Sequence, residues 1–488
     1  MRQNPVEIGP FGFANRQIRC IDSPESPYYT AFVQRETGGV LDEASLAVLC
    51  YRAPEVRLRT WRSPDPLYQW DNGRSVLAAN GGNGPLKGIK VLDWTMWQMG
   101  PVSTAMMGDM GADVIKIEAL DGDAGRAVKR AITLDTGLVA DRNAYFESGN
   151  RNKRGVAINL KTGEGLDIVH KLVEKTDVFV QNFRQGVAER LGLGYDVLKE
   201  INPMLIYGSA SGYGPNGPDS NLPSFDGCGQ ARSGLMMSAT PAGASEPNRL
   251  TQGASDQMGA IMLCLGVLAA LVARSEQGIG QKVDSSHLGS NMWLQGNGIT
   301  MSLLTKGGKF GSYERKTPAN PLSNLYRCGD GRWVQIMHLQ PDRHWVPFAK
   351  VMGMEEYIND PKFATMDDRT QNNTELVEII DQCFATKSFD EWDKAFREAG
   401  DFIYARVQEI EELKDDPQVI ANDYITTFDH PALGTVKMCN HPVTYSETPA
   451  GIYREAPELG QHTEEILIEE LGYDWPAIGK LKEAGAIL

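Results

Sequence analysis

Apolar and polar positions alternate in blocks along most of this chain, and the blocks have the lengths of strands and helices. Short apolar runs bounded by turn residues predict five buried strands, at Ile89–Trp94, Asp113–Glu118, Val178–Phe183, Met204–Gly208 and Gln281–Ser285. Helices are predicted between them, at Val102–Met110, Glu164–Glu174 and Tyr195–Ile201. Strands and helices that alternate at this spacing form βαβ units, so we expect an α/β fold with a mostly parallel sheet. Ligands of such sheets bind where the carboxyl ends of the strands meet the following loops.

Changes in this pattern divide the chain into regions. Residues 1–85 show no sustained periodicity, and we interpret them as an N-terminal extension of unknown role with little independent structure. Residues 86–300 carry the alternation and are expected to form a large domain. In 310–435 aromatic and charged residues mix and two charged amphipathic helices follow, which predicts a smaller α+β domain. Residues 440–488 end in a helical tail that we expect to fold back and complete the large domain.

Charge and cysteine usage narrow the possible partners. The net charge of −15 leaves no basic footprint for a nucleic-acid binder, so a polyanionic ligand needs a local cluster of cations or helix N-termini. The seven cysteines are scattered and include no Cys-x-x-Cys pair, which favours a reduced, cytoplasmic setting. The seven histidines show no ligand spacing, so no metal site is expected.

One apolar run has almost the length of a membrane span. It covers Met258–Ala273, about 16 residues where a span needs about 20, and Asp256 and Arg274 flank it. The first residues of the chain carry no apolar stretch typical of a signal peptide. We therefore predict a core helix and no membrane partner.

Asp256 stands immediately ahead of this predicted helix, in the small-residue stretch Thr251–Gly259. A carboxylate at the positive end of a helix stays ionised, and small neighbours leave room for a carbonyl group to approach it. The same residue type is also a common helix N-cap. The local sequence leaves both interpretations open.

A small basic cluster, Asn152-Lys153-Arg154 with Lys161 nearby, stands out in this acidic chain. It is interpreted either as a phosphate-binding group or as a solvated turn between strands. The first predicted strand is not followed by the glycine-rich dinucleotide motif, which makes an ordinary dehydrogenase an unlikely function, and neither a Walker A loop nor a Gly-x-Ser-x-Gly elbow occurs.

An ordered set of dispersed motifs runs from residue 86 toward the C-terminus. It comprises Leu86–Asp93, Gly100-Pro101, Gly111–Glu118, Asn152–Arg154, Asn182-Phe183, Gly212–Gly214, Gly266–Leu271 and Gly278–Val283. In this order the motifs resemble those of the family III CoA-transferases, which include formyl-CoA, carnitine and phenyllactate CoA-transferases. The resemblance implies a Rossmann-like large domain, a smaller α+β domain and an interlocked homodimer.

The resemblance also implies a reaction and its residues. Asp256 stands at the position of the family's catalytic aspartate, and Gln98 matches an active-site glutamine. The implied reaction transfers CoA from an acyl-CoA to a free carboxylic acid through covalent aspartyl anhydride and aspartyl-CoA intermediates, with backbone amides around Gly253 and Gly259 as oxyanion donors. No tightly bound cofactor is implied, because CoA thioesters are the substrates. The implied CoA contacts are Trp97, Met99, Ile158, Lys161, Asn182, Phe183 and Arg190.

Several positions depart from the family pattern. Ala119 and Ser211 stand where formyl-CoA transferase has basic CoA contacts, and Asn320–Tyr326 replaces its glycine-rich lid, which hints at a larger, more apolar acyl group. Two alternatives remain. The α-methylacyl-CoA racemases share the fold but use a His-Asp pair where this chain has Phe225-Asp226, so the partner base is expected to be missing. The other alternative is a non-catalytic acyl-CoA-binding protein.

Overall fold

The computed structural model describes residues 82–488 apart from 132–133, 252 and 308–312, together with the backbone of three strands nearer the N-terminus. These three strands are β1 (Arg16–Ile21), β2 (Tyr28–Arg35) and β3 (Ala47–Tyr51), and they pair antiparallel in the order β1-β2-β3. They belong to a compact unit spanning Met1–Ser75, and Val76–Leu488 forms a second unit. The rest of the predicted extension, up to residue 81, lies outside the described residues.

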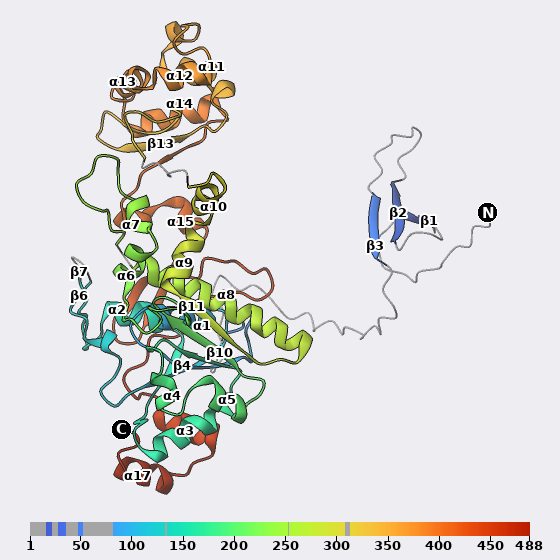
Figure 1. Cartoon of the computed structure of the whole chain (residues 1–488), viewed down its shortest axis with the longest axis vertical. Helices are drawn as coiled ribbons and strands as arrows, with labels where there is room; N and C mark the ends of the chain where they lie inside the picture. The colour runs from blue at the N-terminus through green and yellow to red at the C-terminus, as the bar shows by residue number, and fades with distance from the viewer. Residues whose placement is uncertain are drawn as a thin grey trace. The chain divides into compact units, whose positions relative to one another are not determined.

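The second unit is built on a six-stranded sheet in which every neighbouring pair is parallel (Figure 1). Its order is β11-β10-β9-β4-β5-β8, formed by β4 (Lys90–Trp94), β5 (Asp113–Glu118), β8 (Lys153–Ala157), β9 (Val178–Gln181), β10 (Ile206–Ser211) and β11 (Gln281–Ser286). The predicted α/β class is confirmed. The chain runs from β4 outward to β5 and β8, then returns to β9 on the other side of β4. The topological switch point therefore lies between β4 and β9, where ligands of such sheets bind.

Helices cover both faces of the sheet because its strands alternate apolar side chains between two cores. Val91 packs with Met107 and Leu263 from α1 (Met99–Asp109) and α8 (Ala254–Gln277). Leu92, one residue later, packs in the opposite core with residues of α3 (Gly163–Val173) and α5 (Tyr195–Ile201). The result is a three-layer arrangement with strands buried on both sides.

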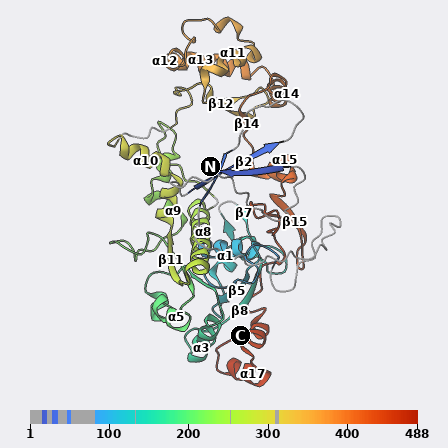
Figure 2. The same cartoon turned by 90° about the vertical axis from the view of Figure 1, so that its right-hand side faces the viewer.

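The C-terminal tail joins the second of these cores. Its helices α16 (Thr463–Leu471) and α17 (Trp475–Glu483) contribute Ile466 and Ile478 to it, and Figures 1 and 2 show α17 beside α3. The backbone N–H of Asn159 donates to the carbonyl of Ala486 over 2.8 Å. Residues close to the C-terminus thus support the segment that follows β8.

Strand β8 is the strand of the large sheet that the sequence pattern did not predict. Asn152, Lys153 and Arg154 are at most 2% exposed, so for these three residues both interpretations, phosphate-binding group and solvated turn, are wrong; Lys161 is exposed. Arg154 makes ion pairs with Asp113 and with the C-terminal helix residue Glu470. Charged residues usually lie at the surface, but Lys153 and Arg154 are buried because each forms an ion pair with a carboxylate inside the protein.

A separate hydrophobic core gathers residues from Leu322 to Phe396. It lies between an antiparallel sheet of order β12-β13-β14 and surrounding helices. The elements of this region are β12 (Ser323–Arg327), β13 (Trp333–Met337), α11 (Pro341–Met352), α12 (Met366–Gln371), α13 (Asn373–Phe384), α14 (Phe389–Ala399), β14 (Tyr404–Arg406), α15 (Pro417–Ala421) and the hairpin β15 (Ile425–His430)–β16 (Gly434–Cys439). The core of residues 322–396 thus has an α+β organisation, whereas His430 of β15 lies 3.5 Å from Glu147 of α2 (Ala144–Asn150).

The remaining elements are short and surround the carboxyl edge of the large sheet. They are β6 (Arg130–Ala131), β7 (Leu134–Asp135), α2 (Ala144–Asn150), α4 (Val187–Arg190), α6 (Asp226–Arg232), α7 (Leu235–Ser238), α9 (His287–Leu294) and α10 (Gly296–Leu304). Helix α6 packs against both α8 and α9.

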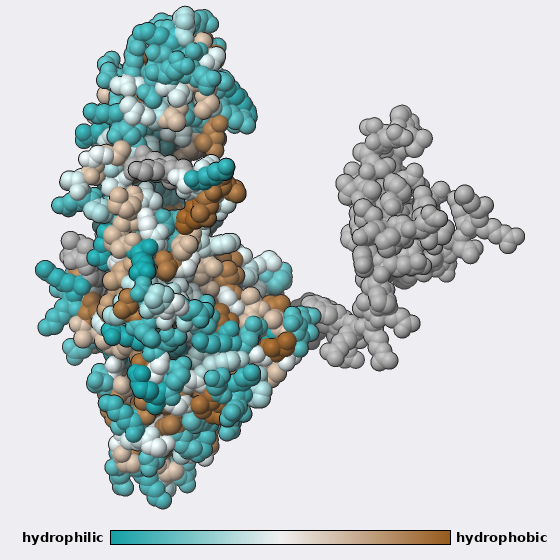
Figure 3. All heavy atoms as spheres, in the orientation of Figure 1, coloured by the Kyte–Doolittle hydropathy of each residue, from teal (hydrophilic) through white to brown (hydrophobic). Residues whose placement is uncertain are grey.

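Helix α8 is long and apolar enough to pass a length and composition test for a membrane span, yet only 33% of its most apolar window is buried. The side chains that pack inward include Leu263 and Val267, whereas Leu265 and Val272 are exposed. Exposed apolar side chains continue on α9 and α10, among them Trp293, Leu294, Leu303 and Leu304. Figure 3 shows brown, hydrophobic patches in the region of α8 and α10. The predicted core helix is therefore buried along one face only.

The core that gathers residues from Leu322 to Phe396 also holds a buried histidine, His338, whose titration we expect to affect acid stability. Burial, and then the stacked ring of His344 at 4.3 Å, lower the pKa of His338 to about 4 from its ordinary 6.5. Because the unfolded chain binds this proton first, the stability contribution is complete above about pH 6.5 and is lost as the pH falls toward 4. We expect about 2 kcal/mol of unfolding free energy to disappear between pH 7 and pH 5. Denaturant unfolding should show this loss in the wild type and a flatter profile in His338→Phe, and equal slopes would contradict it.

Candidate active site

Asp226, a residue of α6, caps the N-terminus of α8. The helix starts after Gly253, which adopts a left-handed conformation (φ 71°). Oδ1 of Asp226 accepts from the backbone N–H of Ser255 at 2.7 Å and from that of Asp256 at 3.4 Å. Asp256 is the third residue of the helix, so its interpretation as the N-cap is wrong. Its own carboxylate is left available, in a half-buried side chain that is 16% exposed.

The carboxylate of Asp256 has a histidine partner that the sequence patterns did not predict. Nε2 of His287 lies 2.9 Å from Oδ1 of Asp256, and the imidazole is 7% exposed. His287 comes directly after β11 and begins α9, so it stands at the carboxyl edge of the sheet. The imidazole beside Asp256 therefore comes from a different element than the position that Phe225 occupies.

Gln98 reaches the same helix end from the loop after β4. A Cβ atom at Gly253 would lie 2.7 Å from Oε1 of Gln98 and 2.8 Å from its Nε2, so only glycine lets the amide approach this closely. Met99 packs one turn further along α8, where a Cβ atom at Gly259 would lie 2.6 Å from its Cε. Gly259 itself is inside α8, where its N–H belongs to the helical ladder, so it does not provide the expected oxyanion donor.

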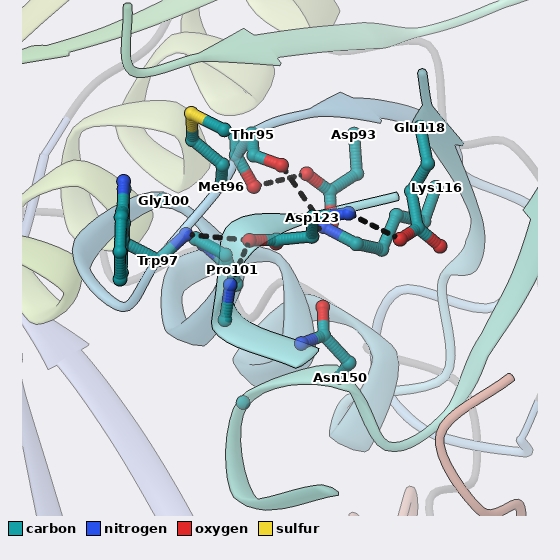
Figure 4. Close-up of polar contacts among 12 residues, drawn as sticks. Asp93, Thr95, Met96, Trp97, Gly100, Pro101, Lys116, Glu118, Asp123 and Asn150 are labelled. Atoms are coloured by element: carbon teal, nitrogen blue, oxygen red, sulfur yellow. Dashed lines mark hydrogen bonds and ion pairs between the residues drawn. The ribbon is translucent and has the colours of Figure 1, made fainter. Parts of the chain in front are cut away.

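A network of buried charges fixes the loop that carries Gln98 (Figure 4). Trp97 has a left-handed backbone (φ 68°), and its N–H donates to Oδ1 of Asp123 at 3.2 Å. The other oxygen of Asp123 accepts from Nζ of Lys116 at 3.0 Å, and Nζ also donates to the carbonyl of Thr95 at 2.9 Å. The side chains of Lys116 and Asp123 are fully buried. The loop from Thr95 to Gln98 is thus bonded to the interior at two backbone groups.

A second buried ion pair lies behind this loop. Nζ of Lys153 is 2.8 Å from Oδ2 of Asp93, at the end of β4, with both side chains fully buried. Burial lowers the pKa of Lys153 to about 8, against the attraction of Asp93. Burial alone would raise the pKa of Asp93, but Lys153 and Lys116 hold it below its ordinary value. Burial likewise opposes the charge of Lys116, whose pKa is nevertheless raised by Asp123, Asp93 and Glu118.

Asn182 connects the two sides of the switch point. Its Oδ1 accepts from the N–H of Met96 at 2.9 Å, and its Nδ2 donates to the carbonyl of the same residue at 2.7 Å. The next residue, Phe183, stacks on Trp94 with ring centroids 4.1 Å apart. The loops after β4 and β9 are therefore joined into one surface at the edge where this fold binds ligands.

The other residues implied by the resemblance lie along the same edge. Ile158 follows β8 and bridges to Ile487, and its side chain is 1% exposed and packs in the core with α3. Lys161 and Arg190 are exposed, after β8 and in α4. Within the described part of the chain, the side chains of Lys161 and Arg190 make no ion pair, unlike the buried Lys153 and Arg154. The structure thus brings these residues to one edge and leaves two cations open to solvent there.

Comparison with known proteins shows which family the chain belongs to. The model of CoA-transferase family III matches residues 86–463. The chain belongs to CoA-transferase family III. It is 34% identical to a (R)-2-hydroxy-4-methylpentanoate CoA-transferase of Clostridioides difficile, over 82% of this chain and 99% of that protein. It is 30% identical to a cinnamoyl-CoA:phenyllactate CoA-transferase of Clostridium sporogenes, over 81% and 95%. The crystal structure of a CAIB/BAIF family protein from Brucella suis superposes with a TM-score of 0.70 at 26% identity, covering 80% of this chain and all (100%) of that one.

This CoA-transferase also places a tyrosine beside the aspartates, which the sequence did not single out. Burial raises the pKa of Tyr145 far above its ordinary value, and the charges of Asp256, Asp123 and Asp226 raise it further. The phenol therefore stays protonated. Tyr145 belongs to α2, more than a hundred positions before Asp256, so neither spacing nor periodicity could have connected the two residues.

Ala119 and Ser211, which replace basic CoA contacts of formyl-CoA transferase, also lie at the carboxyl edge of the sheet. Ala119 follows β5 and Ser211 ends β10, so both stand at the carboxyl edge. Oγ of Ser211 accepts from the N–H of Gly214 at 3.1 Å, which turns the following loop. Neither position supplies a cation, and the exposed Lys161 and Arg190 are the charged residues among the implied contacts.

Proposed function

We propose that this CoA-transferase uses Asp256 as its nucleophile and works through covalent aspartyl intermediates. The observation that carries the proposal is the capping of α8 by Asp226, which frees the Asp256 carboxylate while keeping it at the positive end of the helix. Gln98 provides an amide donor from the neighbouring loop after β4. The arrangement supports a carboxylate that is ionised, accessible and held in place.

The proposed reaction has two halves. The carboxylate of Asp256 attacks the thioester carbonyl, the C–S bond breaks, and CoA thiolate leaves a mixed anhydride on Asp256. The thiolate then attacks Cγ of Asp256 and expels the donor acid, which gives an aspartyl-CoA thioester. In the second half an acceptor carboxylate attacks Cγ and expels thiolate, and the thiolate attacks the new acyl group. Free Asp256 and the product acyl-CoA result.

An apolar acyl group fits the residues around this site. The rings of Trp97 and Phe225 pack edge to face with centroids 5.5 Å apart, and Phe225 is 58% exposed. Trp97 precedes Gln98, and Phe225 precedes the capping Asp226, so the two rings flank the N-terminus of α8. The relatives named above act on 2-hydroxy-4-methylpentanoate and on cinnamoyl-CoA with phenyllactate. We propose carboxylic acids with a branched or aromatic apolar side chain as substrates.

The exposed cations are proposed to hold the phosphates of CoA. Replacing Lys161 or Arg190 by Met should raise the KM for the acyl-CoA roughly tenfold and leave kcat nearly unchanged, because the lost charge acts in binding rather than in chemistry. Steady-state kinetics with varied acyl-CoA measure this. Lys394→Met, an exposed change in α14, serves as the matched control. A fall in kcat at unchanged KM would contradict the assignment.

We also propose that a second copy of the chain covers the exposed apolar face, as a homodimer. The face is formed by α8, α9 and α10, with Val272, Trp293 and Leu304 between 63% and 79% exposed. Contiguous exposed apolar side chains of this size are typical of a protein interface. The measured mass in solution tests the proposal, because a stable, active monomer would contradict it.

Racemisation on the same fold remains the alternative function, since His287 provides the base that Phe225 lacks. A two-base racemase needs its bases on opposite faces of the substrate α-carbon. Here the two groups are in direct contact at 2.9 Å, which leaves no space for a carbon atom between them. Direct contact between His287 and Asp256 is expected for a nucleophile and its hydrogen-bond donor, and not for two bases on opposite faces of a substrate.

One experiment separates transferase, racemase and acyl-CoA-binding protein. The enzyme is mixed with acetyl-, butyryl-, succinyl- or 4-methylpentanoyl-CoA, and intact mass and peptide mapping follow. We expect a hydroxylamine-sensitive adduct on the peptide with Asp256 and none in Asp256→Ala. Deuterium exchange at the α-carbon without any adduct would instead establish the racemase. If neither an adduct nor deuterium exchange is observed, the protein only binds acyl-CoA.

A further inference from the structure

His287 occupies the site without a part in the reaction proposed above. Its ring is held firmly, because Gly229 lets α6 approach so closely that a Cβ atom there would lie 2.6 Å from Cβ of His287. Its Nδ1 faces Oγ of Ser224 at 3.4 Å, and its Nε2 faces Oδ1 of Asp256 at 2.9 Å. The imidazole is therefore fixed with one nitrogen directed at one carboxylate oxygen.

These contacts define which nitrogen carries hydrogen. An ionised carboxylate only accepts hydrogen bonds, so Nε2 of His287 is the donor to Asp256. The hydroxyl of Ser224 is able to donate to Nδ1, which suits the neutral ring with its hydrogen on Nε2. Among the described residues, the side-chain hydrogen bond of Asp256 goes to Oδ1, and Oδ2 is the oxygen left to attack.

We propose that His287 is the oxyanion donor for the carbonyl group of Asp256 itself, an inference that rests on the covalent route proposed above. Once Oδ2 has attacked the thioester, Oδ1 becomes the carbonyl oxygen of the aspartyl half of the anhydride. Nε2–H of His287 still points at it. When CoA thiolate attacks Cγ, the C=O electron pair moves onto Oδ1, and the hydrogen bond strengthens on that developing charge. Collapse then breaks the bond from Cγ to Oδ2, and the donor acid leaves.

This role selects between the two carbonyl groups of the anhydride. Attack of thiolate on the donor acyl carbon only reverses the first step, whereas attack on Cγ carries CoA onto the enzyme. A donor fixed on Oδ1 favours Cγ. The same donor assists the acceptor carboxylate, which also attacks Cγ, now of the aspartyl-CoA thioester. It gives no such help to the first attack, because hydrogen bonding stabilises the Asp256 carboxylate before it reacts.

The test compares two covalent adducts whose masses differ, an acyl group and CoA. His287→Leu removes the donor, His287→Asn keeps a polar atom toward Ser224 but is too short to reach Asp256, and His287→Gln restores an N–H at the position of Nε2. After mixing with butyryl-CoA or 4-methylpentanoyl-CoA and rapid quenching, intact mass gives the ratio of aspartyl-CoA to acyl-enzyme. We expect this ratio and kcat to fall roughly a hundredfold in the Leu and Asn variants, and Gln to recover much of the loss. Water captures the accumulated anhydride, so hydrolysis of the acyl-CoA should rise relative to transfer.

The outcomes separate this inference from the function on which it rests. If the wild type forms both adducts and the Leu and Asn variants show the same ratio, His287 is not the oxyanion donor, while the nucleophile stands. If all variants lose both adducts in parallel, the residue supports the structure only, and the inference is again overturned. If the wild type itself forms no adduct, the covalent route fails and this role fails with it.

Discussion

Asp256→Asn should lower kcat by roughly 10⁴-fold or more, since the substitution removes the proposed nucleophile and leaves only binding and oxyanion donors. The amide has nearly the same shape as the carboxylate and still offers an oxygen to Nε2 of His287. The protein should stay folded, because the cap of α8 belongs to Asp226 and not to Asp256. We expect unchanged thermal stability and retained binding of acyl-CoA, measured by calorimetry beside the kinetics.

Asp226→Asn is the matched control, because it makes the same chemical change at the aspartate of α6 that caps α8. It replaces the charged acceptor of two backbone N–H groups at the start of α8, so it should cost about 1–2 kcal/mol of unfolding free energy. Its activity should fall far less than that of Asp256→Asn, and the covalent adduct should still form. If the two variants lost activity equally while Asp256→Asn remained folded and active in binding, the carboxylate of Asp256 would have no special role.

The parts of the fold that the sequence predicted are those whose signal is local. Asp113–Glu118 and Tyr195–Ile201 have the bounds expected from apolar runs and helix ends. The strand Lys153–Ala157 was missed because its charges look like surface residues when read alone. Their partners, among them Asp93, Asp113 and Glu470, stand far away in the chain, and only the folded structure brings them within reach.

The site divides in the same way. Asp256 could be selected from the sequence, because small residues and an apolar helix surround it, yet its capping role could not be separated from a chemical one. The structure gives the capping role to Asp226, which belongs to another helix and stands 30 positions earlier in the chain. His287 could not have been found, since the contact with Asp256 depends on where β11 ends relative to α8. In the sequence this histidine has no neighbouring residue that would mark it as part of a site.

The largest expected effect on stability comes from the buried charges under the Gln98 loop, and Lys116→Met tests it. The change leaves the fully buried carboxylate of Asp123 without its ion-pair partner, and breaking such a pair costs about 3–5 kcal/mol. The matched control is Lys482→Met, which breaks the partly exposed pair with Glu464 and should cost less than about 1 kcal/mol. Denaturant unfolding of both variants gives the comparison.

The same substitution should reach the active site through the backbone of Trp97. Without Lys116, Asp123 loses the partner that fixes its carboxylate, and the carbonyl of Thr95 loses its donor, so the left-handed turn before Gln98 relaxes. Adding Asp123→Asn removes the unpaired charge while keeping an oxygen for the N–H of Trp97. The double variant should therefore regain part of the stability, and also part of the affinity for acyl-CoA, relative to Lys116→Met alone. Additive losses in the double variant would mean that the two side chains act independently and that the ion pair does not hold this loop.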